Sequence, residues 1–296
     1  MDSAIEQFLS HLSGDKGYSE NTVSAYRNDL TQFMQFLQRS DVGRWPRLRQ
    51  QDILAYGLHL REREYKQSTL ARKLASVRSF SHFLKDAGVV TDDPAEGLDS
   101  PQVARRTPRT LSDKEVALLL ELPGRTPTAK GLRDRAILEL LYATGMRVSE
   151  VTSLDLDDAD SVSGSIICGR STPAQRAIPL NPHAMEALRA YLDFGREELV
   201  TAAGQTALFV NHRGERLSRQ GLWLVIKHYV KELGLGDNVT PHTLRHSAAA
   251  HRLSLGANIT EVQHLLGHAN PSSTQIYLRI ARASRKEAAE PRYATA

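Results

Sequence analysis

Apolar residues recur at helical spacing through residues 1–99, and they do not alternate there as they would in a strand. Four stripes are present: Ile5, Phe8, Leu9 and Leu12; Tyr26, Leu30, Phe33, Phe36 and Leu37; Ile53, Leu54 and Leu58; and Leu70, Leu74, Val77, Phe80 and Leu84. Gly88 follows the last stripe and is suited to end its helix. The pattern predicts an N-terminal domain of four helices, with these stripes as its core.

The stretch over residues 100–111 interrupts this periodicity. The sequence DSPQVARRTPRT, residues 99–110, contains two prolines and three arginines and has no apolar stripe. This composition predicts an extended linker. Its arginines either follow a phosphate backbone or only keep a solvated linker extended. Ser112 and Glu115 then have the spacing of a capping box, which predicts that a helix and a second domain, residues 112–296, begin there.

Residues 112–296 combine helical and strand patterns. Helices are predicted over residues 132–144, 182–199, 219–233, 241–255 and 259–266. Asn181, just before Pro182, is a favourable N-cap. Short strands are predicted over residues 165–168, 177–180 and 208–211. The predicted fold class is therefore mainly α with a small β-sheet, in which a four-helix domain precedes a mixed α/β domain.

Composition narrows the classes of function. The 296 residues suffice for about two domains, and a hydrophobic content of 41% is ordinary for a globular protein. A net charge of +4 permits a nucleic-acid partner without requiring one. The single cysteine, Cys168, excludes an internal disulfide framework and fits a reducing cytosol. No secretory pattern opens the chain and no apolar run approaches about 18 residues, so we expect a cytoplasmic protein without a membrane span.

The candidate chemistry is concentrated in the segment PHTLRHSAAAHRLSLGANITEVQHLLGHANPSSTQIYLRI, residues 241–280. This segment holds His242, Arg245, His268 and Tyr277, and Arg147 lies upstream in ATGMRVSE. Arginine binds phosphate oxygens bidentately and keeps its charge at any working pH. Histidine exchanges protons near neutrality, and tyrosine is a covalent nucleophile once cations lower its pKa. This set of side chains suits an attack on a phosphodiester without a metal.

Four motifs occur in a fixed order: an arginine followed by VSE, then HTLRH, then LLGH, then a tyrosine nine residues after the last histidine. In combination they resemble the tyrosine recombinases of the phage integrase family, of the Xer type. The resemblance runs from FLSHLSGDKGYSENTVSAYRNDLTQFMQFL through RDRAILELLYATGMRVSEVTSLDLDD to LLGHANPSSTQIYL, nearly the whole chain. It implies a SAM-like helical DNA-binding domain followed by a recombinase catalytic domain.

The resemblance also implies a role for each candidate residue. Tyr277 attacks the scissile phosphate and leaves a 3′-phosphotyrosyl bond and a free 5′-hydroxyl. Arg147 and Arg245 hold the two non-bridging oxygens, where charge accumulates in the transition state. His242 is the general base or a donor to the phosphate, and His268 is a second donor.

The chain departs from the family in one hairpin. Where the family places a lysine that protonates the departing 5′-oxygen, CGRS places Arg170, and no lysine lies between Lys130 and Lys227. An arginine neutralises charge but is a poor proton donor. Either Arg170 acts electrostatically, or a lysine arrives from another loop, or the enzyme is slow or inactive.

The neighbours of these residues carry further expectations. The apolar surroundings of Arg147 predict that its side chain is buried and needs an anion, for which Glu150 is the candidate. Glu150 could equally orient His242 or Arg147. The other histidines of the region, His246, His251 and His264, are interpreted as structural.

The family implies duplex DNA with a two-armed site as the partner. Four protomers, all of this chain or shared with a paralogue, exchange strands without ATP, metal or another cofactor. A C-terminal tail couples the protomers, the location is the bacterial nucleoid, and the role is chromosome-dimer resolution. Alternatives are a small mobile-element integrase and a DNA-binding accessory protein that has lost the catalytic lysine. A metallohydrolase on the pairs His242–His246 and His264–His268, which have i,i+4 spacing, is a further alternative.

Overall fold

The structure is a computed structural model that describes residues 1–40, 42–98, 107–160, 163–170, 172, 175–267 and 272–289; for 272, 273 and 283–289 it describes the backbone only. The chain forms two compact units, Met1–Arg105 and Arg106–Ala296. No helix among these residues is both long and apolar enough to cross a bilayer. His268 and the last seven residues of the expected coupling tail lie outside the described residues.

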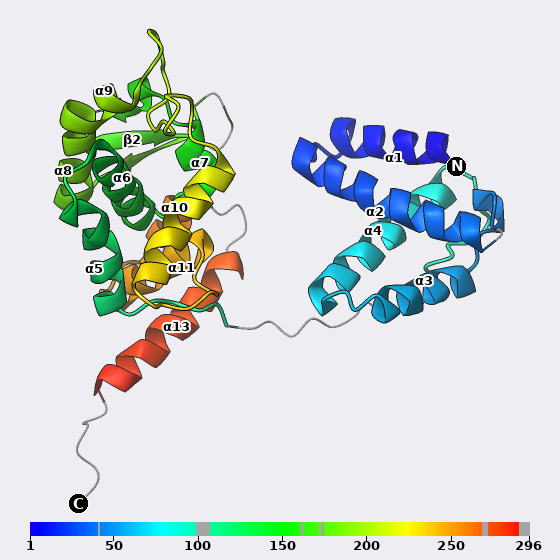
Figure 1. Ribbon diagram of the computed structural model, residues 1–296. Coiled ribbons are helices and arrows are strands. Elements are labelled where there is room, and N and C mark those ends of the chain that lie inside the picture. The colour runs from blue at the N-terminus through cyan, green and yellow to red at the C-terminus, as the bar shows by residue number, and fades with distance from the viewer. Residues whose placement is uncertain are drawn as a thin grey trace, which may run out of the picture. The chain divides into compact units, whose positions relative to one another are not determined.

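The N-terminal unit contains four α-helices within residues 1–98: α1 (Asp2–Gly14), α2 (Glu20–Arg39), α3 (Gln50–Glu62) and α4 (Gln67–Asp86), with a short 3-10 turn, Trp45–Arg47, before α3 (Figure 1). Its core combines buried residues of all four helices with Trp45 and Leu48. Two aromatic pairs in this core pack edge to face, with the ring centroids of Phe8 and Phe80 5.4 Å apart and those of Trp45 and Phe80 4.8 Å apart.

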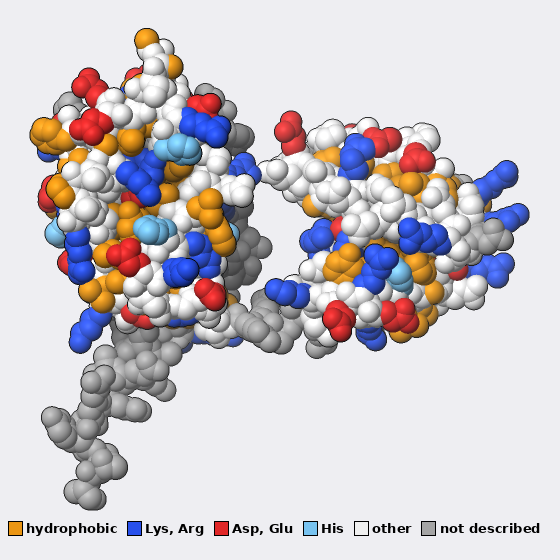
Figure 2. All heavy atoms as spheres, viewed as in Figure 1, with side chains coloured by type: hydrophobic (Ala, Val, Ile, Leu, Met, Phe, Trp, Pro, Cys, Tyr) orange, Lys and Arg blue, Asp and Glu red, His pale blue; other side chains and the backbone are white. Residues whose placement is uncertain are grey.

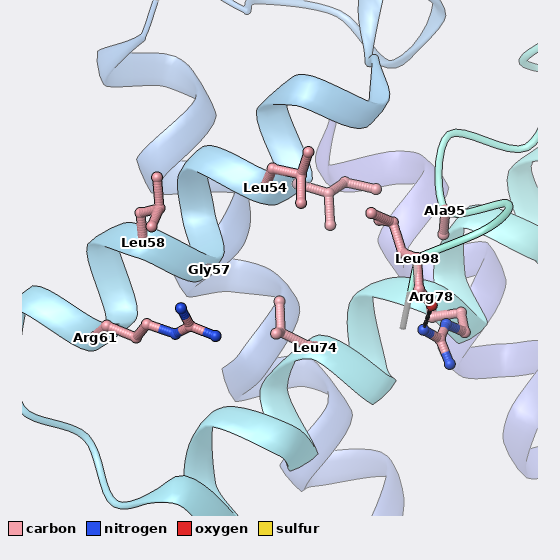
Figure 3. Close-up of a pocket in the computed structure, with 9 residues that line it drawn as sticks. Leu54, Gly57, Leu58, Arg61, Leu74, Arg78, Ala95 and Leu98 are labelled. Atoms are coloured by element: carbon pink, nitrogen blue, oxygen red, sulfur yellow. Dashed lines mark hydrogen bonds between the residues drawn. The ribbon is translucent and has the colours of Figure 1, made fainter. Parts of the chain in front are cut away.

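The stripe predicted for α3 is wrong in part. The structure buries Ile53, Tyr56 and Leu60, while Leu54 and Leu58 are more than half exposed. The buried residues have spacings of three and four, so they, and not the leucines, share the face toward the core. Leu54 and Leu58 instead line a hollow of about 330 Å³ between α3 and α4, which Figure 3 shows with Leu74 and Arg61 at its wall.

A polar cluster is buried between α2 and α4. Both oxygens of Asp29, which is 1% exposed, accept hydrogen bonds, from Lys73 Nζ at 3.1 Å and from Ser76 Oγ at 3.0 Å. Arg72 also bonds this carboxylate, and Lys73 Nζ donates to Gln32 at 2.7 Å. The charges are therefore neutralised and hydrogen-bonded inside the unit, as burial requires.

The C-terminal unit is mainly helical. Its α-helices within the described residues are α5 (Asp113–Glu121), α6 (Ala129–Thr144), α7 (Val148–Ser153), α8 (Pro182–Ala190), α9 (Arg196–Leu199), α10 (Arg219–Glu232), α11 (Pro241–Ser254), α12 (Ile259–Leu266) and α13 (Ser272–Ala289). Beside them lies a small antiparallel sheet in the order β1 (Ala159–Asp160), β2 (Ser165–Cys168) and β3 (Arg176–Pro179). The predicted fold class is confirmed.

Local signals place several boundaries. Ser112 and Glu115 form the predicted capping box of α5, and Asn181 caps α8 by accepting from the Ala184 N–H at 2.8 Å. The third strand is wrong: residues 208–211 contribute only an isolated bridge, and β1 completes the sheet. The helix predicted over residues 182–199 is interrupted by a π-turn at Tyr191–Gly195.

The end of the predicted linker belongs structurally to the C-terminal unit. The guanidinium of Arg109 bonds the Asn238 side chain and the Leu235 carbonyl. The Leu111 N–H donates to Ser247 Oγ on α11 at 2.8 Å, and the Leu111 side chain is 1% exposed. Arg105 and Arg106 lie outside the described residues.

Helix α6 is the centre of this unit, and it is buried on almost every side. Its buried pair, Arg133 and Asp134, is satisfied internally, since Asp134 also accepts from the hydroxyl of Tyr229 at 3.0 Å. In Figure 1, α11 lies against α6, and α13 crosses α11 with its last turns projecting beyond it. The candidate residues are carried by these central helices and by the turns that end them.

Candidate active site

Two left-handed glycines bring the ends of α6 and α12 together. Gly145 ends α6 with φ 60°, and a Cβ there would lie 2.7 Å from Leu266. Gly267 ends α12 with φ 60°, and a Cβ there would lie 2.9 Å from a guanidinium nitrogen of Arg176. Only glycine meets both the conformation and the space. The first turn sets Arg147 at the start of α7, where the chain meets α12.

A single carboxylate, that of Glu150 on α7, collects three guanidinium groups. Arg176 bonds both of its oxygens, at 3.0 and 3.3 Å, Arg147 Nη1 lies 3.3 Å away, and Arg245 Nη1 lies 3.9 Å away. The Arg147 backbone N–H also donates to Glu150 Oε2 at 2.6 Å. We call these four residues the Glu150 cluster.

The electrostatics of the cluster keep Glu150 ionised. Burial by itself would raise the pKa of Glu150, but the hydrogen bonds from Arg176 and from the Arg147 backbone outweigh it and hold the pKa below its usual value. One negative charge among three arginines leaves a local surplus of positive charge. The site is therefore prepared for a second anion.

Arg245 is fixed inside the protein. Its side chain, on α11, is 6% exposed and donates to the carbonyls of Gly145 and of Leu266, the latter at 2.6 Å. Burial and the nearby charge of Arg147 lower the pKa of Arg245 to about 10, so the guanidinium is still charged at neutral pH. These carbonyls belong to the two glycine turns, which set the direction of the guanidinium.

Tyr277 is buried on α13, packed in an apolar cluster with Leu253 of α11 and Leu266 of α12. Only 2% of its surface is exposed. Its hydroxyl and His246 Nδ1 are 2.7 Å apart, and the two ring centroids are 5.5 Å apart. Burial raises the pKa of Tyr277, and the charge of Arg245 partly opposes this. In this state the phenol is held in its protonated form.

The structure brings some of the predicted residues together and not others. Arg147 and Arg245 meet at Glu150, and Tyr277 lies within electrostatic reach of Arg245. His242 is exposed on α11, with its ring centroid 6.4 Å from that of His246. His268 follows Gly267 and lies outside the described residues.

Arg170 is engaged elsewhere. Its Nε lies 2.5 Å from the buried Asp158 carboxylate, and its Nη2 donates to the Asp157 carbonyl at 2.7 Å. The hydrogen bond that Arg170 donates to the Asp158 carboxylate raises the pKa of Arg170. The first lysine after Arg170 in the sequence is Lys227. Its ammonium donates to the Asp237 carbonyl and lies over the Trp223 ring.

One sequence expectation is wrong, and two further residues make contacts that the sequence did not indicate. The Arg147 side chain is 44% exposed rather than buried, because it begins a helix at the surface. His246, interpreted as structural, contacts the candidate nucleophile; its i,i+4 spacing from His242 was the available signal. Arg176, which had attracted no interpretation, is 14% exposed and binds Glu150. The only sequence signal for Arg176 is an arginine at the start of a short apolar strand, and this signal is weak.

Two other kinds of chemistry, metal binding and thiol reactivity, depend on the His, Cys, Asp and Glu side chains of the unit. In the described part of the chain, no three His, Cys, Asp or Glu side chains gather closely enough to hold a metal ion. Cys168, the last residue of β2, is fully buried beside Glu150. Burial, and then the charge of Glu150, raise the pKa of its thiol to about 12.

Family models match both units. A model of the phage integrase family matches residues 109–284, and a model of the phage integrase N-terminal SAM-like domain matches residues 5–88. Among solved structures, XerA recombinase has a TM-score of 0.55 at 26% identity over 99% of both chains. XerH site-specific recombinase bound to a palindromic difH substrate shares the fold, with a TM-score of 0.75 at 19% identity over 98% of this chain and 84% of that one.

Curated relatives match almost end to end. Tyrosine recombinase XerC of Roseiflexus sp. (strain RS-1) is 47% identical over 286 residues, which cover 96% of this chain and 91% of the relative. Tyrosine recombinase XerD of Oceanobacillus iheyensis is 37% identical over 289 residues, which cover 97% of each chain. With an integrase model spanning more than half of its length and relatives of this identity, the chain belongs to the phage integrase family and is a tyrosine recombinase.

Proposed function

We propose that this recombinase cleaves one DNA strand with Tyr277 and rejoins it through a 3′-phosphotyrosyl bond. The observation that carries the proposal is the surplus of positive charge in the Glu150 cluster, beside a buried tyrosine. A scissile phosphate would replace Glu150 as the partner of Arg147 and Arg245, while Arg176 keeps Glu150 in place. Fixed guanidinium groups stabilise the charge that develops on the phosphate oxygens, which accelerates the reaction.

Duplex DNA is the proposed substrate. On the face shown in Figure 2, Lys and Arg side chains form blue patches on each unit. Basic patches of this kind bind the phosphate backbone and position a protein for recognition. Solved structures with the same fold include a lambda integrase dimer bound to a core site and a lambda integrase tetramer bound to a Holliday junction. We propose a two-armed site and a tetramer of this chain, alone or with a paralogue.

The names of the relatives support chromosome-dimer resolution in the bacterial nucleoid as the cellular role. One observation favours a second candidate, a DNA-binding accessory protein with weakened chemistry. The hairpin residue that stands in for the family lysine is Arg170, and Asp158 holds its guanidinium. If the hairpin supplies no proton to the departing 5′-oxygen, cleavage loses a factor of about 10²–10⁴.

The decisive experiment uses a nicked duplex whose site has been selected from random DNA by binding to this protein. Cleavage beside the nick traps the covalent adduct, which a denaturing gel resolves. Wild type is expected to form the adduct, with or without a chelator, and Tyr277→Phe is expected to form none while binding DNA normally. Tyr142→Phe, which removes a hydroxyl from α6 in the same unit, is the matched control. If the wild-type protein binds DNA normally but forms no adduct, the DNA-binding accessory function is supported instead.

A further inference from the structure

The hydroxyl of Tyr277 has an imidazole partner that no motif interpretation assigned. His246 Nδ1 lies 2.7 Å from this hydroxyl, within the range at which a general base takes a proton. His246 is half-buried on α11, one turn after His242 and next to Arg245. The contact joins two elements, because Tyr277 comes from α13.

The environment makes a proton acceptor necessary. Burial stabilises the neutral phenol over the phenolate that must attack phosphorus, and the charge of Arg245 offsets this only in part. Water has little access to a side chain that is 2% exposed. An acceptor must therefore already be at the hydroxyl, and His246 Nδ1 is at that place.

The side chains around His246 include several cations. On α11, His246 has Arg245 beside it and His242 one turn earlier, with the two histidine ring centroids 6.4 Å apart. Across the site, the Glu150 cluster adds Arg147 and Arg176. Nearby cations oppose the protonation of a histidine, the carboxylate of Glu150 favours it, and a neutral imidazole is the form that can take a proton.

We propose that His246 is a catalytic residue that takes the proton of Tyr277 during cleavage, an inference that rests on the function proposed above. In this step the Tyr277 oxygen bonds to phosphorus, its proton passes to His246 Nδ1, and the bond from phosphorus to the 5′-oxygen breaks. The 5′-oxygen keeps the electron pair and is protonated by a separate donor, water or a side chain. In religation His246 returns the proton to Tyr277.

The test is the rate of adduct formation in a single turnover, measured against pH on the nicked duplex. His246→Asn keeps a hydrogen-bonding group near the position of Nδ1 but takes no proton, and His246→Ala keeps neither property. Both are expected to be slower by about 10²–10⁴, with DNA affinity nearly unchanged. Wild type should lose rate as pH falls through the titration of one histidine, and both variants should lose that dependence.

A matched control comes from the same helix. His251→Asn alters an imidazole on α11 that contacts Tyr142 and Asp113, and it should keep the wild-type rate and pH profile. If His246→Asn restores the full rate that His246→Ala loses, the residue only positions Tyr277 and the proposal is overturned. An unchanged rate and profile in His246→Asn overturns it as well. Thermal unfolding checks that each variant is folded. If a variant does not fold, His246→Gln is used in its place.

A second DNA substrate distinguishes a general base that acts on Tyr277 from a general acid that protonates the departing 5′-oxygen. A 5′-bridging phosphorothiolate has a leaving group that needs no proton, so it rescues defects in the acid alone. His246→Asn should stay slow on it; full rescue would make His246 the acid and overturn the inference.

The results distinguish a failure of the proposed function from a failure of this inference. Absence of an adduct in wild type, or an adduct in Tyr277→Phe, overturns both. An active wild type with normal His246 variants overturns the inference alone.

Discussion

Each unit of this protein contains a carboxylate that gathers several cations, yet the two clusters differ in what they leave open. Asp29 in the N-terminal unit has two cationic partners, Arg72 and Lys73. Glu150 in the C-terminal unit has three, Arg147, Arg176 and Arg245. One negative charge thus leaves a formal surplus of +1 in the first cluster and +2 in the second.

Exposure separates the clusters further. Lys73 is almost fully buried and shares its ammonium between Asp29 and Gln32, so this cluster is closed around the lysine, and only Arg72, which is half-exposed, reaches solvent. Arg147 is 44% exposed, which gives the Glu150 cluster an edge to solvent. A buried charge pair alone therefore does not indicate function. The larger surplus of the Glu150 cluster, with three guanidinium groups on one carboxylate, distinguishes the candidate phosphate site from the Asp29 cluster.

The largest effect should come from breaking the closed cluster. Asp29→Asn keeps the shape but leaves the buried Lys73 without its counter-charge, which costs about 3–5 kcal/mol of stability in the N-terminal unit. The protein has one tryptophan in each unit, Trp45 and Trp223. Urea unfolding in a Trp223→Phe background therefore reports the N-terminal unit through Trp45. Asp86→Asn, an exposed site on α4, is the control, and equal stability of the two variants would contradict the closed-cluster account.

The open cluster should respond in the opposite way. Arg147→Ala removes a half-exposed side chain, so stability should change by no more than about 1 kcal/mol. Its adduct formation should fall by about 10²–10³, since a donor to the transition state is lost. The rate on the nicked duplex and the DNA affinity are measured together. Arg135→Ala, which removes a partly exposed arginine paired with Glu186, should change neither; parallel losses of affinity and rate in Arg147→Ala would make Arg147 a simple backbone contact.

The smallest effect concerns pH. The pKa of folded Glu150 lies below its usual value of 4.5, so its ion pairs contribute stability above about pH 4.5 and lose it as pH falls through the folded pKa. Glu150→Gln should therefore be less stable than wild type at pH 7, with a gap that narrows below pH 4.5. Urea unfolding read from Trp223 in a Trp45→Phe background measures this gap. A gap that is constant with pH would show that Glu150 acts by shape alone.

The sequence was sufficient for most of the architecture because local rules decide it. The apolar spacing of Ile5, Phe8 and Leu9 predicts α1 and its buried face, and the Ser112 cap marks the start of α5. Prediction from sequence failed where two different sets of apolar residues had equally helical spacing. In α3, Leu54 and Ile53 are adjacent apolar residues, and only packing against α2 and α4 decides which of them is buried.

The candidate site was predictable in composition but not in geometry. Motif order supplied Arg147, Arg245 and Tyr277, which come from the N-cap of α7, from α11 and from α13. The contacts of Arg176 with Glu150, and of His246 with Tyr277, join residues 26 and 31 positions apart in the sequence. No periodicity reports such contacts, since they depend on the turn at Gly145 and on how α13 packs against α11.

The single thiol of the chain has a practical consequence for following the protein during recombination. Burial raises the pKa of the Cys168 thiol to about 12, so the thiol is protonated at pH 7, and its side chain is fully buried. Maleimide dyes react with exposed thiolates, so the native chain should remain unlabelled. A fluorophore attached to one cysteine introduced on the surface would then report assembly on DNA without background, and the residue beside Glu150 would not need to be replaced.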